Sequence, residues 1–111
     1  MRLHGDGSRD GSYGHDGVGT VPLESADVAP DGVGGLFVVG YHHRGYQVRR
    51  LDPAGRPDRS FGSLPLRDAY DEEGLQILAQ GRGRAIVVAR DEETCRSSCP
   101  SDPQLFRVLL R

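Results

Sequence analysis

The sequence lacks lysine and asparagine altogether, has two cysteines, and contains no long apolar run. Its apolar runs are far too short to span a bilayer, and residues 1–5 (MRLHG) are not followed by the apolar stretch of a signal peptide. We therefore expect a cytoplasmic protein or a piece of a longer secreted one. The 14 basic residues, all arginine, and 16 acidic residues leave a net charge of −2, which argues against a general binder of nucleic acid or anionic membranes.

The composition favours an all-β chain with a thin core. A length of 111 residues allows one domain at most. Leucine, isoleucine, valine and phenylalanine supply 26 residues, which exceeds the level typical of disorder but is little for a self-sufficient core. Sixteen glycines and seven prolines favour short strands and turns over helices.

Residues 50–62 (RLDPAGRPDRSFG) are a second copy of residues 2–14 (RLHGDGSRDGSYG), shifted by 48 positions. Six of the thirteen positions are identical, against roughly one expected from ordinary residue usage. In the second copy, Asp52–Gly55 has the composition of a turn, and the Asp58 carboxylate is expected to accept the backbone N–H of Ser60. Tyr13 and Phe61 are expected to be equivalent apolar plugs. The chain is therefore predicted to be a repeat protein.

Strands are predicted at 18–23, 26–29, 35–40, 46–51 and 63–66, and then at 75–79, 84–89 and 105–110. Residues 35–39 are apolar on both faces, as in a strand buried between neighbours. Residues 84–89 match the first unit at an offset of 49, and residues 106–111 match Tyr46–Leu51 at an offset of 60. The difference, 60 minus 49, predicts an insertion of 11 residues in the loop 90–104.

Several of these residues also resemble a known family. The turn Pro30-Asp31-Gly32, the strand 36–40, Arg50-Leu51, and Gly55, Asp58 and Phe61-Gly62 together resemble the bacterial delta-sixty repeat, a β-propeller-like repeat. The chain departs from that pattern at Val33-Gly34, which are additional, and at residues 80–83, which replace Pro-Asp-Gly. The resemblance implies about two propeller-type blades of four antiparallel strands, and no defined activity.

The predicted organisation has three parts. Residues 1–25 are the end of a preceding repeat, residues 26–66 a complete blade, and residues 67–111 a second, incomplete repeat with an inserted cysteine loop. Because repeat units bury their faces on neighbours, two units leave two open sides. We therefore expect as partners either neighbouring repeats of a longer chain or other copies of this one, with residues 18–23 completing the sheet of another copy.

Two groups of residues are candidates for metal binding. Asp6-x-Ser8-x-Asp10 resembles the start of a calcium loop but has Gly17 where the closing glutamate belongs. Cys95 and Cys99 are a candidate disulfide in an oxidising compartment. Together with His42 and His43 they are also a candidate zinc site, although their spacing matches no common zinc pattern.

No serine lies in a nucleophile elbow, and no cofactor motif is present. Arg49 and Arg50 are interpreted as solvated strand charges. The loops 41–44 (Tyr41, His42, His43, Arg44) and 92–102 are the candidate binding rim. We therefore predict a non-catalytic, structural or protein-binding segment without a cofactor; the alternatives are a small calcium- or zinc-stabilised domain and a hydrolase.

Overall fold

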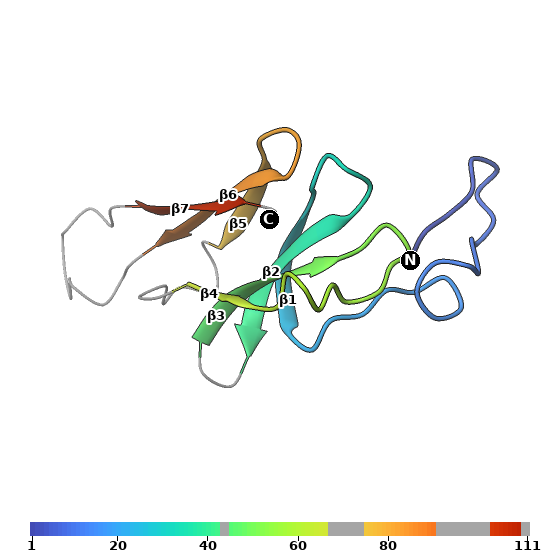
Figure 1. The fold of residues 1–111 in the computed structure, drawn as a ribbon, viewed down its shortest axis with the longest axis horizontal. Coiled ribbons are helices and arrows are strands. Elements are labelled where there is room, and N and C mark those ends of the chain that lie inside the picture. Colours follow the sequence, from blue (N-terminus) through green and yellow to red (C-terminus); the bar gives the residue numbers. More distant parts are fainter. Residues whose placement is uncertain (43–44, 67–74, 91–102, 110–111) are drawn as a thin grey trace.

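The computed structural model describes residues 1–42, 45–66, 75–90 and 103–109, and within these ranges the fold is all-β without a helix. The first antiparallel sheet contains β1 (Glu24–Pro30), β2 (Leu36–His42), β3 (Gly45–Leu51) and β4 (Leu64–Pro65), in that order. The second contains β5 (Gln76–Ala79), β6 (Arg84–Arg90) and β7 (Pro103–Leu109). Figure 1 shows the N-terminal segment and the second sheet at opposite ends of the long axis, with the first sheet between them. A helix able to cross a membrane is absent from these ranges.

Strand β2 is buried on both faces, as its sequence predicts. Phe37 and Val39 are fully buried on one face, and Val38 is 3% exposed on the other. On β3, Tyr46 and Val48 are both buried, which confirms the predicted alternation. A strand in the middle of the first sheet therefore has material packed against each side of it.

The main core lies between the two sheets. It is a cluster of buried side chains from both sheets and from the two residues that adjoin β4 and β5, Leu66 and Leu75; its other members are Ala29, Phe37, Val39, Tyr46, Val48, Ile77, Ala85, Val87 and Val108. Among the described residues, two hydrogen bonds join the sheets directly. The N–H of Ile77 donates to Asp27 Oδ2 at 2.9 Å, and the N–H of Gly83 donates to the carbonyl of Asp31 at 2.6 Å. The two sheets are therefore stacked face to face.

The hairpins β1–β2 and β5–β6 have the same geometry at the predicted offset of 49. Asp31 N donates to Gly35 O at 3.0 Å, and Gln80 N donates to Arg84 O at 3.0 Å. The strand registers agree as well, because Val28 faces Val38 as Ile77 faces Val87. In the first turn Gly32 has φ 79°, and a Cβ there would lie 2.8 Å from the carbonyl oxygen of Gly81, so the second hairpin requires a glycine at this place.

The predicted offset of 60 for the third strand is wrong. Leu36 pairs with Leu51, and its equivalent Ala85 pairs with Val108, so β3 and β7 correspond at an offset of 57. The insertion is therefore 57 minus 49, or eight residues, and not 11. The offset of 60 was obtained by matching aromatic and apolar residue types. The register of β7 is instead determined by its backbone hydrogen bonds to β6. In this register Arg107-Val108 is the equivalent of Arg50-Leu51.

The predicted strand at 18–23 does not form. Its only β-type pairing in the described part of the chain is a single bridge between His15 and Val18. Within that part, residues 19–23 have no neighbouring strand with which to exchange ladder hydrogen bonds, which a strand needs. By contrast Leu64 and Pro65, at the predicted strand 63–66, do pair, with Val48 and Gln47 of β3.

Candidate functional site

A buried ion-pair network ties the first hairpin to the repeated segment. Arg50 donates from Nε to Asp31 Oδ2 and from Nη1 to Asp58 Oδ2, both at 2.7 Å. The Asp31 side chain is fully buried and that of Arg50 is 9% exposed. Arg50 was predicted to be a solvated charge, and that prediction is wrong. The two carboxylates on either side of it, 19 residues before and 8 residues after in the sequence, are what allow the guanidinium to be buried.

The charged state of this network is maintained by hydrogen bonds. Burial by itself would raise the pKa of Asp31, but the N–H groups of Val33 and Gly35 and the Arg50 guanidinium outweigh it and lower that pKa. Burial likewise opposes the charge of Arg50, yet its two carboxylate partners raise its pKa. Both groups are therefore ionised at neutral pH, and the network holds the turn after β1 against the end of β3.

The two copies of the repeated segment have the same bonding. Asp10 and Asp58 each use one carboxylate oxygen for an arginine eight residues earlier and the other for the N–H and hydroxyl of a serine two residues later. In both copies the Asp N–H donates to the carbonyl of that same arginine, at 3.0 Å and 2.9 Å. The predicted turn at Asp58 is therefore confirmed, and an arginine joins it. We call these two segments, residues 2–14 and 50–62, the first and second corner.

The first corner lies directly against the second. Gly14 N donates to Ala54 O at 2.6 Å, and Arg2 Nη1 donates to Pro53 O at 3.2 Å. The buried Tyr13 ring covers Gly55, where a Cβ would lie 2.7 Å from ring atoms and where φ is 81°. Glycine is therefore required at position 55 both for the turn and for the approach of the tyrosine.

The aromatic residues of the two corners have different neighbours. Tyr13 lies against the second corner, with the Arg2 guanidinium 5.0 Å from its ring centre. Phe61 instead packs on Phe37 of β2, with 5.7 Å between ring centres. The predicted equivalence therefore holds for backbone and ion pairs but not for the surroundings of the two rings.

Acid is expected to weaken both corners. Serine hydroxyls and then arginines lower the pKa of Asp10 and of Asp58 to about 2, from the ordinary 3.8. A lowered pKa in the folded state contributes stability that is complete above about pH 4 and is lost as the pH falls towards 2. We expect the free energy of unfolding, measured by urea denaturation, to decline over that interval. Asp58→Asn should lower stability at pH 7 and flatten the decline, whereas Glu24→Gln, an exposed control, should change neither; an unchanged slope in Asp58→Asn would contradict the assignment.

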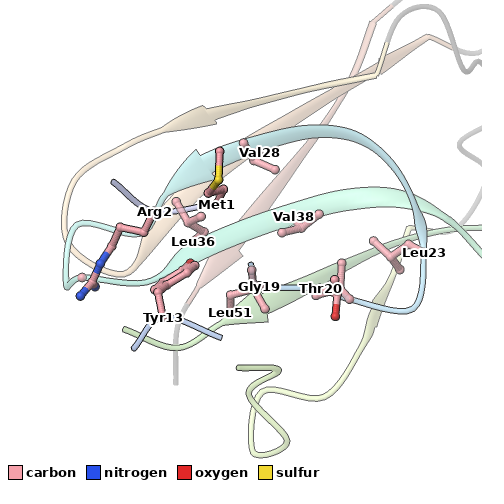
Figure 2. Close-up of a pocket in the computed structure, with 12 residues that line it drawn as sticks. Met1, Arg2, Tyr13, Gly19, Thr20, Leu23, Val28, Leu36, Val38 and Leu51 are labelled. Carbon is pink, nitrogen blue, oxygen red and sulfur yellow. The ribbon is translucent and has the colours of Figure 1, made fainter. Parts of the chain in front are cut away.

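The face of the first sheet that points away from the second sheet forms an apolar groove. The cavity has a volume of about 700 Å³, and Figure 2 shows its lining from the first sheet on one side and the N-terminal segment on the other. The sheet contributes Val28, Leu36, Val38 and Leu51, the turn after β1 contributes Gly34, and the N-terminal segment contributes Met1, Arg2, Tyr13, Gly19, Thr20, Val21 and Leu23. Val28 is 52% exposed in it. The first sheet is therefore only partly covered on this face.

The groove floor matches a surface that is buried elsewhere in the chain. At the offsets set by the registers, its four sheet residues are equivalent to four residues of the second sheet, namely Val28 to Ile77, Leu36 to Ala85, Val38 to Val87 and Leu51 to Val108. All four of these second-sheet residues are buried in the core between the sheets. The groove is thus the face that, in the second sheet, receives a neighbouring sheet. The sequence signal for it was the strand 35–39 with apolar residues on both faces.

Two of the predicted rim residues, Tyr41 and His42, line a smaller hollow. Tyr41, 39% exposed, stacks edge-on against Tyr46 with 5.4 Å between ring centres. With His42 and residues 22–24 it lines a cavity of about 340 Å³. The other predicted rim residues lie outside the described residues: His43, Arg44 and the loop 92–102 with Cys95 and Cys99. The structure therefore does not test the disulfide and zinc predictions.

The calcium-loop resemblance is not supported by the side chains. Both Asp10 oxygens are engaged with Arg2 and Ser12, and Asp6 Oδ1 accepts from the N–H and hydroxyl of Ser8. In the ranges that the structure describes, no three histidine, cysteine, aspartate or glutamate side chains are grouped as metal ligands would be. These carboxylates instead shape the first corner.

Comparisons of the chain with protein-family models, with curated proteins and with solved structures find no match. The delta-sixty resemblance therefore stays a prediction. The groove, with its register equivalents in the core, is the feature from which a function can be argued.

Proposed function

We propose that this chain is a non-catalytic, propeller-like repeat segment that binds protein through the apolar groove on the outer face of its first sheet. Each unit of such a segment is a small antiparallel sheet followed by an Arg–Asp corner. A sheet of this kind buries one face on the unit before it and the other on the unit after it. The bound partner in this proposal is an apolar sheet face.

The observation that carries the proposal is the equivalence between the groove floor and the buried face of the second sheet. Val28 and Val38 have the same places in their sheet as Ile77 and Val87, which pack in the core between the sheets. A groove of this size lined mainly by apolar side chains is typical of binding surfaces. Filling it removes apolar area from water, which favours association.

The ion-paired groups support a structural assignment over a catalytic one. Asp31, Asp58 and Arg50 have lowered or raised pKa values that favour their charged forms, so they are not poised to exchange protons near neutral pH. They lie at the corner and do not line the groove. We therefore assign them to holding the units in shape.

The groove is tested by binding of the apolar dye 1-anilinonaphthalene-8-sulfonate to the full chain at low micromolar concentration. We expect the dye to bind, and Val28→Glu to weaken its binding about tenfold, because the carboxylate would have to be desolvated. Val33→Glu is the matched control, since Val33 is 37% exposed in a turn and outside the groove. Equal dye binding by wild type and Val28→Glu would overturn the proposed binding surface.

A further inference from the structure

The chain carries both halves of the contact that joins its two sheets. The first sheet presents Ala29, Phe37 and Val39 to the second sheet. At the offset of 49, the equivalents of these residues in the second sheet are Leu78, Ile86 and Val88. Leu78 is 55% exposed, and Ile86 and Val88 are partly exposed. The second sheet therefore exposes, at one end of the molecule, the equivalent of the face with which the first sheet packs on the second. We call the side chains of Leu78, Ile86 and Val88 the filling face.

The groove at the other end is the matching half. Its floor residues Val28 and Val38 are equivalent to Ile77 and Val87, which receive the first sheet inside the chain. The filling face and the groove thus lie on opposite sides of the pair of stacked sheets. Two copies placed head to tail would bring one of each together.

We propose that a second copy of this chain binds in the groove, with its Leu78–Ile86–Val88 face against the exposed part of the floor at Val28 and Leu36. This inference rests on the proposed function and names its partner. The contact is heterologous, because each copy contributes a different surface, so copies can add further to make a ring or a longer stack. The in-chain contact between the sheets is its template.

The N-terminal residues have a specific part in this docking. Arg2, by the corner repeat, and Arg107, by the strand register, are both equivalents of Arg50. Docking in the groove would consequently bring residues 106–108 of the docked copy to the place that residues 1–3 of the receiving copy occupy. Met1 is 67% exposed, the Arg2 side chain is half exposed, and Arg107 is exposed. Because both segments cannot occupy this place, residues 1–3 move away when the second copy docks. Arg107 of the docked copy then replaces Arg2 as the partner of Asp10.

The decisive experiment mixes two full-length variants in sedimentation velocity. Val28→Glu blocks the groove and keeps the filling face, whereas Leu78→Glu blocks the filling face and keeps the groove. Both residues are more than half exposed, so both variants should keep the wild-type circular dichroism spectrum. We expect wild type to gain mass with concentration, each variant alone to stay at the mass of one chain, and an equimolar mixture to form a complex of two chains. Val33→Glu should behave as wild type.

Two results would overturn the proposal. One is a wild-type mass equal to one chain up to about 1 mM, the weak end of protein affinities; if Val28-dependent dye binding persists, the proposed function stands and only the second copy is excluded. The other is association that Val28→Glu abolishes and Leu78→Glu leaves intact, which would show groove-to-groove contact. Loss of Val28-dependent dye binding would instead remove the proposed function itself.

Exchange at Asp10 has its own readout in the same mixture. Arg107→Met in the copy that carries Val28→Glu is expected to weaken the two-chain complex about tenfold, the value of one hydrogen bond between charged groups. Arg2→Met in the copy that carries Leu78→Glu should not weaken it, because Arg2 leaves Asp10 on docking. Weakening by Arg2→Met with no effect of Arg107→Met would overturn the assigned exchange.

Discussion

Replacing Asp31 by alanine is expected to destabilise the protein by about 3–5 kcal/mol, the usual cost of removing one partner of a buried ion pair. The Asp31 side chain is fully buried and accepts from Arg50 and from the N–H groups of Val33 and Gly35. Its removal leaves the buried guanidinium with Asp58 alone. Urea denaturation followed by circular dichroism measures the loss, which is a large part of the total stability of a small domain, about 5–15 kcal/mol.

The matched control for this prediction is Asp52→Ala. Asp52 caps its turn in the same way as Asp31, with Oδ1 accepting from the N–H groups two and four residues later. It is partly exposed and has no arginine partner among the bonds of the described residues. We expect Asp52→Ala to cost about 1–2 kcal/mol, from the backbone hydrogen bonds alone. Equal losses in the two variants would show that Asp31 only shapes a turn and that the buried ion pair is not needed.

The second large effect is expected at the sheet-to-sheet core. Phe37 is fully buried there and also packs on Phe61. Phe37→Ala removes most of a ring from between the sheets and leaves a cavity, at a cost of about 3–5 kcal/mol in the free energy of unfolding. The second sheet should lose its protection from amide exchange together with the first, because both sheets pack against this ring.

Val28→Ala is the control for the opposite face of the same sheet. Val28 is half exposed in the groove, so its truncation in the dissociated chain should change stability by about 0.5 kcal/mol or less. A Phe37→Ala loss of similar size would contradict a core between the sheets.

Local patterns predicted much of this fold. Apolar runs and alternation located the strands of both sheets, and the repeated Asp-x-Ser with its glycines located the two corners. Burial of strand β2 from both sides followed from Leu36–Val39, which are apolar at consecutive positions. These features depend on neighbours in the chain, so a single sequence can show them.

The predictions that were wrong and the features that were missed depend on residues that are far apart in the sequence. The Arg50–Asp31 pair spans 19 residues, and an arginine next to another arginine on a strand gives no sign of which one is buried. The register of β7 is determined by its bonds to β6 across an insertion, and residues 18–23 look like a strand but have none beside them in the described ranges. The groove was missed as a site because its lining has the sequence of an ordinary core and is only partly covered in the structure.

Amide hydrogen exchange at Ile77 and Gly83 tests most directly the central claim, which is that the two sheets stack face to face. These N–H groups donate across the sheet interface, to the side chain of Asp27 and the carbonyl of Asp31. We predict exchange slowed by at least about a hundredfold at both, with Asp27→Ala releasing Ile77 while the β2–β3 amides stay protected. Exchange of Ile77 and Gly83 at the rate of an unfolded chain, beside protected amides within each sheet, would contradict the stacking.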